Sequence, residues 1–410
     1  MSEFAFGILS DIAKGKRGVT YKPEDLVIGG EQEHYRLLTA GNIQDGITTT
    51  HSYAKVSPRC VSQNQLISPD EILVCMSNGS KRLVGKSSRL RSADSKRYCV
   101  GAFCSTFTPN EDADPEFVFQ IFQSENFKKH VSDALEGSAI NNLKNSTIES
   151  FEVPIPPLPE QKKIAEILSR IDSLILKSEM RIQKLQFSHS SFSAEAFCIR
   201  PGLDSQEVAL GDIVTLRHGY QFRTPDFAEN GAKVIKISQV IGDGVVIIED
   251  CDRVPWTLAT EKEKFRLNPG DVLMSLTGNI GRVGIVPDTN EVLLQNYRVG
   301  LFAPSGKSIS REYMIHLLES RQVVSQLEDN SNASAQANFG KGDLDKIMVY
   351  LPEAQMQVRT ASFLSSSKDR IMKEKRKVEV FRKMKQSISS ELLSGRKRVG
   401  EARVLEGVGI

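Results

Sequence analysis

Apolar residues recur with the most regular spacing in two long segments, one in the middle of the chain and one near its C-terminus. Between Ile164 and Leu185 the apolar positions are separated alternately by four and three residues, with Ser178 in the one gap. The segment that begins after Pro352 keeps the same rhythm. Such heptad spacing places apolar side chains on one face of a helix and favours pairing with a second helix. The positions predicted to pair the helices are Ile164, Leu168, Ile171, Ile175, Ile182, Leu364, Ile371, Val378 and Phe381.

Proline and glycine mark the ends of both predicted helices. Prolines cluster from Pro154 to Pro159, and they predict no regular structure directly before the first helix, which Pro159 is suited to begin. No proline or glycine follows until Pro201, and Gly395 is placed to end the second helix. A helix of about 40 residues would be about 60 Å long at 1.5 Å per residue.

The chain contains this pattern twice. Upstream of the helices the separation between matching residues varies from 198 to 201 positions, which indicates loops of different length on a shared scaffold. Two copies are too few for a solenoid, so we expect two homologous halves related by a pseudo-two-fold axis. Such an axis would run the two helices antiparallel. Around the helices, identical residues recur at a constant separation of 196 positions, among them Pro156 and Pro352, Gln161 and Gln357, and Ile175 and Ile371.

Each half is predicted to begin with a mixed α/β globule, which makes the whole an α+β protein. The boundaries we expect are a first globule over 1–155, a helix over 156–200, a second globule over 201–350, a helix over 351–398 and a tail over 399–410. Runs of β-prone residues that are bounded by turn residues predict strands, and apolar runs that are followed by polar residues predict helices. The predicted strands are Tyr35–Thr39, Glu71–Met76, Lys233–Ile237 and Asp271–Leu276, and helices begin within Phe117–Phe122 and Tyr313–Leu318.

Composition places the chain among soluble globular proteins, with 410 residues of which 40% are hydrophobic and 25% charged. It has no apolar run near the roughly 20 residues that cross a bilayer, and its N-terminus lacks a signal-peptide pattern. We therefore expect a cytoplasmic protein without a membrane partner. The six cysteines lack zinc-site spacing. A net charge of +2 means that any contact with nucleic acid must come from local patches.

Motifs for catalysis are missing from the sequence. The segment 79–87 resembles a phosphate-binding loop, but Ser80 stands where the spacing requires its first glycine. Pro287-Asp288 resembles the start of a nuclease motif, but Leu293 stands where that motif has lysine. The six histidines show no metal-ligand spacing. We therefore expect recognition rather than catalysis.

Polar and basic residues gather at matching positions in the two globules, in the segments where the repeat separation changes. Arg, Lys, Asn and Gln pair with base edges in the major groove, and Lys, Arg, Ser and Thr also bind phosphates. Solvated surface is the alternative interpretation. We expect the amides of Gln221 and Asn279 to read bases, and Lys81 and Lys86 to bind phosphates. The candidate DNA contacts are Lys16, Arg17, Tyr21, Asn78, Ser80, Lys81, Arg82 and Lys86, and His218, Tyr220, Gln221, Arg223, Thr277, Asn279, Arg282 and Asn296.

The segment 153–168, VPIPPLPEQKKIAEIL, resembles a junction found in the specificity subunit of type I restriction–modification enzymes. There it joins a target-recognition domain to a conserved helix. Segments 38–43, 137–143 and 390–395 resemble the same family, so the resemblance covers nearly the whole chain. The second junction departs from the pattern, because it keeps Pro352 and Gln357 but lacks the run of prolines.

The resemblance implies a non-catalytic subunit whose two target-recognition domains each read half of a split DNA sequence. It implies that the paired helices set the spacing and dock two methyltransferase subunits, which use S-adenosylmethionine to methylate adenine. Restriction subunits, in systems that have them, add ATP- and Mg²⁺-dependent translocation and cleavage. No cofactor is expected on this chain.

Three alternatives stay open at this point. The chain could serve a methylation-only or type IIB-like system, or it could be a coiled-coil scaffold that binds only protein. A self-sufficient DNA methyltransferase is the third, but it would need a cofactor-binding glycine loop and a motif such as Asn-Pro-Pro-Tyr, and the sequence has neither.

Overall fold

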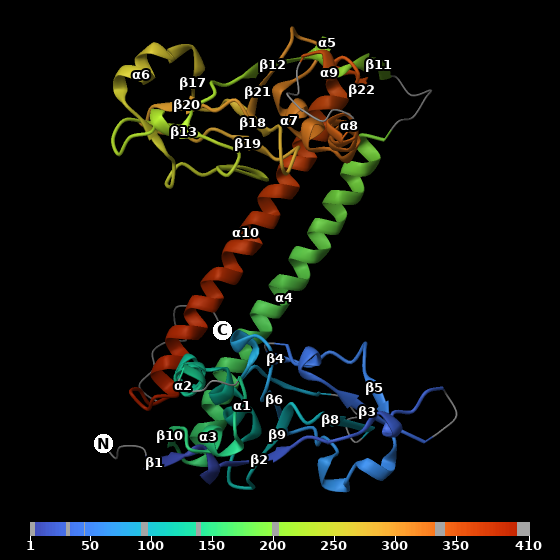
Figure 1. The fold of residues 1–410 in the computed structure, drawn as a ribbon, viewed down its shortest axis with the longest axis vertical. Coiled ribbons are helices and arrows are strands. Elements are labelled where there is room, and N and C mark those ends of the chain that lie inside the picture. The colour runs from blue at the N-terminus through green and yellow to red at the C-terminus, as the bar shows by residue number, and fades with distance from the viewer. Residues whose placement is uncertain are drawn as a thin grey trace. The chain divides into compact units, whose positions relative to one another are not determined.

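The computed structural model describes residues 5–29, 33–44, 46–91, 97–136, 141–198, 205–332 and 341–399. The chain divides into two compact units (Figure 1). Unit 1 comprises Met1–Ser178 and Lys377–Ile410, and unit 2 comprises Glu179–Arg376. Each unit therefore contains one globule together with a part of both long helices. No helix within the described ranges is long and apolar enough to cross a membrane.

The globule of unit 1 is built on a five-stranded sheet with the order β2-β9-β6-β7-β4. A three-stranded sheet, β5-β3-β8, and the antiparallel pair β1-β10 complete it. Its strands are β1 (Ala5–Ile8), β2 (Ala13–Arg17), β3 (Tyr35–Leu38), β4 (Gly46–Ile47), β5 (Ala54–Val56), β6 (Ile72–Cys75), β7 (Ser87–Arg89), β8 (Tyr98–Val100), β9 (Cys104–Pro109) and β10 (Glu152–Ile155). Its helices are α1 (Pro115–Gln123), α2 (Glu125–Glu136) and α3 (Asn145–Glu149).

The globule of unit 2 repeats this plan with additional strands. Its main sheet has the order β12-β21-β18-β19-β15-β14, beside the four-stranded sheet β16-β13-β20-β17 and the pair β11-β22. The strands are β11 (Ser205–Ala209), β12 (Val214–His218), β13 (Ala232–Ile235), β14 (Val240–Gly242), β15 (Gly244–Val246), β16 (Arg253–Val254), β17 (Arg266–Leu267), β18 (Val272–Ser275), β19 (Val283–Ile285), β20 (Leu293–Gln295), β21 (Val299–Pro304) and β22 (Met348–Pro352). The helices are α5 (Leu210–Ile213), α6 (Trp256–Glu261), α7 (Arg311–Glu319), α8 (Arg321–Asn332) and α9 (Lys341–Leu344).

These elements confirm the predicted α+β repeat. The four predicted strands correspond to β3, β6, β13 and β18, and the two predicted shorter helices to α1 and α7. The strand order β2-β9-β6-β7 of unit 1 recurs as β12-β21-β18-β19 in unit 2. The varying separation of matching residues therefore reflects loops of different length between equivalent strands.

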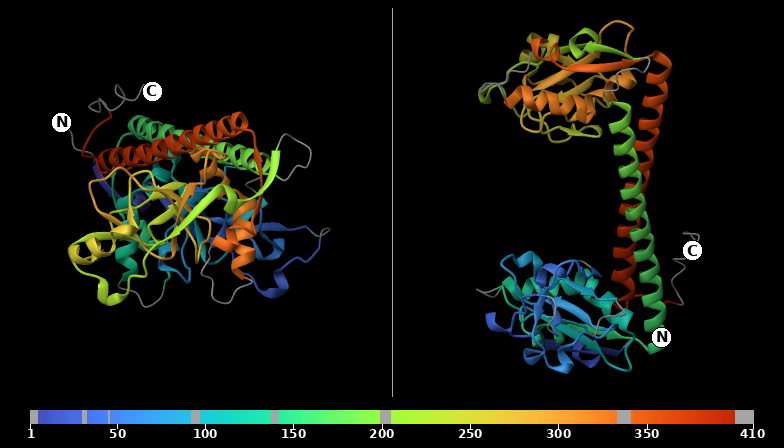
Figure 2. Two further views of the ribbon diagram at one scale, coloured as in Figure 1. Left: turned by 90° about the horizontal axis from the view of Figure 1, so that it is seen from above. Right: turned by 90° about the vertical axis from the view of Figure 1, so that its right-hand side faces the viewer.

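The two long helices are α4 (Leu158–Ala196) and α10 (Ala354–Leu392), each of 39 residues. In unit 1, Lys385 Nζ lies 2.7 Å from Asp172 Oδ1. In unit 2, the rings of Phe192 and Phe363 are centred 4.2 Å apart. Later positions on α4 thus contact earlier positions on α10, and the predicted antiparallel pairing is confirmed (Figure 2).

The apolar face of the helices does more than pair them. Ile164, Leu168 and Ile171 are buried in the core of unit 1, in one cluster with Phe117 of α1. Leu364 likewise joins the core of unit 2. The apolar stripe is therefore covered at its ends by the globules as well as by the other long helix. Among the remaining predicted pairing positions, Ile371 and Val378 are buried, and Ile175, Ile182 and Phe381 are half-buried.

One prediction about the prolines is wrong. Pro154 lies within strand β10, where it pairs with Phe6 of β1. The sheet has two strands, so along its other edge β10 needs no backbone donor, and a strand at a sheet edge tolerates proline. Regular structure therefore does precede α4, despite the cluster of prolines. Helix α4 itself begins at Leu158, one residue before Pro159.

The matched glutamines Gln161 and Gln357 explain why the repeat separation stays constant here. Gln161 Oε1 accepts a hydrogen bond from the backbone N–H of Asp114 at 2.9 Å, and Gln161 Nε2 donates to Pro156 O. Asp114 in turn caps α1. Gln357 makes the same bonds to Ser310, the cap of α7, and to Pro352. Each buried amide thus fixes the start of a long helix to the start of a short one.

Candidate nucleic-acid interface

The candidate site of unit 1 lies where the C-terminal ends of β2 and β6 meet the turn before β9. Arg17, the last residue of β2, donates from Nη1 to Ala102 O at 3.3 Å and from Nη2 to Leu143 O at 2.7 Å. Ser77, just after β6, forms a β-bridge with Asn142. The structure thereby gathers three segments far apart in the sequence around the exposed Arg17 side chain.

The connection from β6 to β7 carries most of the predicted contacts in unit 1. Ser80, Lys81 and Arg82 are exposed, whereas Asn78 and Lys86 are half-buried. Asn78 Oδ1 accepts from Ser80 N at 3.0 Å, so this amide also shapes the loop. Lys81 Nζ lies 3.4 Å from Leu135 O near the end of α2, a position where a cation also favours the helix dipole.

A glycine fixes the path of this connection in each unit. Gly85 has φ +85°, and a Cβ there would lie 2.6 Å from Val131 Cγ1 of α2. Gly281 has the same φ, and a Cβ there would lie 2.6 Å from Val324 Cγ2 of α8. Only glycine combines a left-handed backbone with so close an approach. The two loops therefore share one anchored geometry although their sequences differ.

Lys16 differs from the other candidates because its ammonium already forms an ion pair. Its Nζ is 3.2 Å from Glu71 Oε1, a carboxylate that is 3% exposed. Glu71 also accepts from Thr108 Oγ1 at 2.6 Å. Binding of a phosphate by Lys16 would leave a buried carboxylate without its cation, which is costly. Tyr21, four residues beyond β2, is exposed.

Unit 2 presents the equivalent segments after β12 and β18. Gln221 and Arg223, beyond the end of β12, are exposed, and His218 and Tyr220 are half-buried. After β18, Asn279 and Arg282 are exposed. The Oγ1 of Thr277 is buried and has no hydrogen-bond partner within the described part of the chain. The side chains that meet solvent most fully are thus Gln221, Arg223, Asn279 and Arg282.

Two of the unit 2 candidates serve the fold as well. Asn296 is 6% exposed, and its Oδ1 accepts from Arg298 N at 3.3 Å. Tyr220 forms a parallel bridge with Asn296, and its ring lies 5.7 Å from that of Phe265. Lys262 Nζ lies 4.6 Å from the centre of the Tyr220 ring. Asn296 and Tyr220 therefore both contribute to the fold, and neither side chain is fully exposed for contact with a base.

Sequence reasoning missed Phe103 and Lys262 beside these loops. Phe103 is 68% exposed in the turn before β9, and Arg298 is exposed in the equivalent turn before β21. Lys262 lies directly before the short helical turn Glu263–Phe265 of unit 2, and the pKa of Lys262 is raised by a hydrogen bond to Glu261. Phe103 could be found only by matching its turn to that of Arg298, and the register of β9 and β21 establishes this match.

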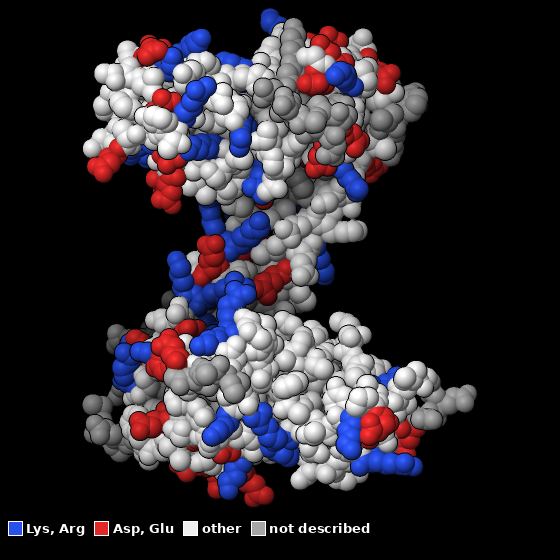
Figure 3. Space-filling view, in the orientation of Figure 1, with Lys and Arg blue, Asp and Glu red and all other residues white. Residues whose placement is uncertain are grey.

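Charge is mixed on the visible surface of each globule, where Lys and Arg alternate with Asp and Glu (Figure 3). This agrees with the net charge of +2. The candidate loops therefore supply local positive groups rather than a uniformly basic face. Among the described residues, no group of three His, Cys, Asp or Glu side chains is placed to hold a metal ion.

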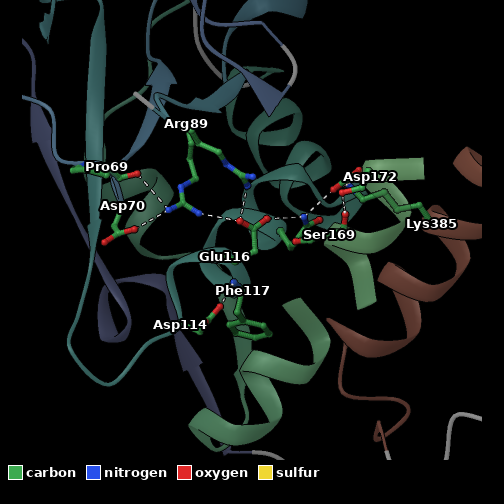
Figure 4. A network of polar contacts seen from close by, with 12 residues as sticks. Pro69, Asp70, Arg89, Asp114, Glu116, Phe117, Ser169, Asp172 and Lys385 are labelled. Atoms are coloured by element: carbon green, nitrogen blue, oxygen red, sulfur yellow. Dashed lines mark hydrogen bonds and ion pairs between the residues drawn. The ribbon is translucent and has the colours of Figure 1, made fainter. Parts of the chain in front are cut away.

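A partly buried polar network connects the sheet of unit 1 to the long helices (Figure 4). Arg89 of β7 pairs with Asp70 at 2.9 Å and with Glu116 of α1 at 3.0 Å. Burial, opposed by these carboxylates, lowers the pKa of Arg89. Gln120 then donates to Asp172 of α4 at 2.9 Å, and Asp172 binds Lys385 of α10. The network holds the sheet that carries the candidate loops in place on both helices.

Comparison with known proteins gives one consistent family. The sequence matches the family model for the type I restriction modification DNA specificity domain over residues 62–186 and 203–381. It is 26% identical over 408 residues to the MjaVIII specificity subunit of Methanocaldococcus jannaschii, covering 94% of this chain and 90% of the relative. It is 33% identical over 169 residues to the EcoKI specificity subunit of Escherichia coli, covering 41% of this chain and 36% of the relative.

Solved structures share the fold. The S subunit of a type I restriction–modification system from M. genitalium has a TM-score of 0.61 at 12% identity, covering 95% of this chain and 96% of that one. A chain from a structural study of assembly and conformational transition in the type I system has a TM-score of 0.57 at 14% identity, covering 96% and 98%. At these identities the likeness concerns the fold alone.

Proposed function

The chain belongs to the type I restriction–modification DNA specificity family and is a DNA sequence-recognition subunit, and we propose that each of its globules reads one half of a bipartite site. One observation carries the proposal. The connections after β2 and β6 in unit 1 and after β12 and β18 in unit 2 share a backbone framework but differ in side chains. Equivalent scaffolds with different loops are suited to reading two different sequences.

The long helices are proposed to set the distance between the half-sites and to dock two methyltransferase subunits. Large apolar side chains remain exposed on both helices, as an interface core requires. On α4 these are Leu176, Met180 and Phe187, and on α10 they are Met356, Val358, Phe363 and Val380. The 75% exposure of Phe187 makes it the most exposed of this group, and hence a good first position for testing the interface.

Catalysis is proposed to reside entirely on the partners. Methyltransferase subunits would bind S-adenosylmethionine and methylate adenine within the site that this chain selects. Restriction subunits, in a system that cuts DNA, would add the ATP- and Mg²⁺-dependent steps. A methylation-only system would use this chain in the same way, because recognition is the step assigned to it.

The test is to assemble the chain with its methyltransferase subunits and to map methylated adenines in DNA from a host that lacks other adenine methylation. We expect one bipartite motif, with two specified halves separated by a gap of fixed length. A continuous motif would contradict the assignment of one half-site to each globule. An assembled complex that binds duplex DNA no better than its methyltransferase subunits do would instead favour a scaffold that binds only protein.

A further inference from the structure

The turn that enters β9 in unit 1 is built in the same way as the turn that enters β21 in unit 2. In unit 1, Cys104 N donates to Gly101 O at 2.8 Å, which closes the turn, and Met76 N donates to Phe103 O at 2.8 Å. In unit 2, the closing bond of 3.0 Å runs from Val299 N to Asn296 O. Its third residue, Arg298, accepts from Leu276 N at 3.1 Å. Phe103 and Arg298 thus occupy equivalent positions.

The backbone of the unit 1 turn is held from several sides. Gly101 N donates to Leu38 O at 2.9 Å, and Ser77 N donates to Phe103 O at 3.1 Å. Arg17 reaches Ala102 O through Nη1. The ring of Phe103 is nonetheless 68% exposed. The backbone that carries this apolar ring is thereby held in a fixed place among polar candidate contacts, so ordering the turn costs little further entropy on binding.

The unit 2 turn fixes a different group in that place. Arg298 Nε donates to the hydroxyl of Tyr297 at 2.7 Å, and the guanidinium carbon lies 5.3 Å from the centre of the Tyr297 ring. The two Nη groups of Arg298 have no hydrogen-bond partner within the described residues. A guanidinium held by its Nε, with its terminal donors available, is preorganised for bidentate binding.

We propose that the third residue of this turn determines base specificity in each half, and that the two halves read by different chemistry. Arg298 donates two hydrogen bonds to O6 and N7 of a guanine. Phe103 makes an apolar contact with the 5-methyl group of a thymine. The inference rests on the proposed function, since it assumes that each globule reads one half-site. It goes further by assigning a G·C pair to unit 2 and a T·A pair to unit 1.

The first test compares Arg298→Ala and Arg298→Lys in the assembled methyltransferase. Loss of a bidentate contact should relax one G·C position of one half-site, with a fall in discrimination of about 5- to 150-fold. The lysine variant should relax the same position, because an ammonium keeps the charge but not the fork. Arg321→Ala, at an exposed position of α8, is the matched control and should leave the motif unchanged.

The outcomes separate readily. If Arg298→Ala weakens all sequences alike and Arg298→Lys restores binding, the side chain binds phosphate and the proposal is overturned. If the motif stays unchanged in an active variant complex, the turn does not read bases, although the proposed function stands. Thermal unfolding of each variant chain shows whether a lost activity reflects misfolding. If Arg298→Ala misfolds, the motif methylated by the Arg298→Lys complex tests the proposal in its place.

The second test uses the thymine methyl group directly. Phe103→Ala should relax one T·A position in the other half-site. Replacing that thymine by uracil in a synthetic duplex should weaken methylation by the wild-type complex and have no further effect on Phe103→Ala. Phe6→Ala is the control, because Phe6 is 70% exposed on β1, outside the candidate loops. Equal effects of uracil on wild type and Phe103→Ala would overturn the assignment to Phe103, whereas a wild-type complex without a bipartite motif would contradict the proposed function itself.

Discussion

The candidate contacts differ in how far their polar groups are exposed and in whether these groups already have a partner within the fold. Gln221 and Asn279 are exposed, so their amides can reach a base edge without disturbing the fold. Asn296 carries the same group but is almost buried and accepts a hydrogen bond from its own turn. Lys16 is paired with buried Glu71. Residue type alone therefore does not identify a reader; the partners that the fold supplies decide which groups remain available.

Gln221→Ala and Asn279→Ala should each relax one position of the half-site read by unit 2. An amide that pairs bidentately with adenine contributes about 1–3 kcal/mol of discrimination. The measurement is binding of the assembled methyltransferase to cognate duplexes and to single-mismatch duplexes. Mismatch penalties that match those of the wild type for both variants would place the reading surface on another face of the globule.

Lys81→Ala should weaken binding to all sequences alike. An exposed ammonium that neutralises one phosphate releases condensed counterions, so its removal should lower the salt dependence, the slope of log K against log salt concentration, by about one. Lys86→Ala is the companion variant, and its half-buried position predicts a smaller change. Titrations at several salt concentrations measure the slopes. A change confined to one base pair would show that Lys81 reads sequence.

At the scale of elements, α1 in unit 1 and α7 in unit 2 contact the long helices α4 and α10 through different polar groups. In unit 1, Gln120 of α1 binds Asp172, which binds Lys385. The positions 196 residues away from Gln120 and Asp172 are His316 and Lys368, and His189 lies 196 residues before Lys385. The amide, the carboxylate and the ammonium at the helix junction of unit 1 are thus replaced by two histidines and a lysine in unit 2.

His189 gives this junction a dependence on pH. Burial, and then the charges of Lys368 and His316, lower the pKa of His189 from its ordinary 6.5, whereas Glu319 and Asp243 oppose the shift. His189 Nδ1 is buried without a hydrogen-bond partner within the described residues. A lowered pKa means that the unfolded state binds the proton more readily. This contribution to stability is therefore full above about pH 6.5 and declines as the pH falls toward the pKa in the folded state.

The prediction is that α7 exchanges its amide hydrogens faster as the pH is lowered below about 6.5, after correction for the intrinsic exchange rate. His189→Gln should flatten this dependence, because it removes the titrating ring. His51→Gln, an exposed position, is the control. A second decline should come at lower pH from Glu319. Burial raises the pKa of Glu319, but hydrogen bonds to His316 and Lys368 outweigh it and hold the pKa below 4.5. The same dependence in His189→Gln and wild type would contradict this account.

At the scale of the whole molecule, the spacer and the globules can be tested separately. Arg181 of α4 and Glu374 of α10 form an ion pair of 3.6 Å within unit 2. Removing 176–182 and 373–379 deletes one heptad from each helix together with both members of this pair. The apolar stripe keeps its phase, because seven residues are two turns of a heptad seam.

This paired deletion should shorten each helix by about 10 Å at 1.5 Å per residue. The proposed spacer would then separate the half-sites by about three fewer base pairs at 3.4 Å each. The methylated motif should keep both halves and lose about that many positions from its gap. A deletion in α4 alone, which breaks the register of the pair, is the control and should abolish assembly or activity. An active paired variant with the original gap would rule out the helices as the spacer.

Exchange of the second globule with that of a relative should change one half of the motif and leave the other half intact. The structure sets the boundary. Strand β22 ends at Pro352 and pairs with β11, so the exchanged segment should be 201–352 rather than 201–350. Cutting inside β22 would mix two strands of different origin in one ladder. If both halves of the motif change in the exchanged complex, the globules do not read independently.

The sequence by itself determined the parts that depend on local periodicity. The heptad spacing from Ile164 onward and the matched Gln161 and Gln357 sufficed to predict two long helices and a duplicated α+β fold. These signals are readable because a helix is specified by neighbours three and four residues apart, and because a repeat compares the chain with itself. The general position of the candidate loops followed in the same way, from the places where the repeat separation changes.

Only the tertiary structure decided which candidate side chains are available. Lys16 meets Glu71, 55 residues away, and Arg17 meets Leu143, 126 residues away. The sequence contains no local sign of either contact, because strand pairing brings these residues together. Pro154 could enter a strand because its sheet has two strands, and Phe103 and Arg298 became equivalent only once β9 and β21 were in register with their neighbours. Long-range pairing determines burial and partners, and those determine which groups can reach DNA.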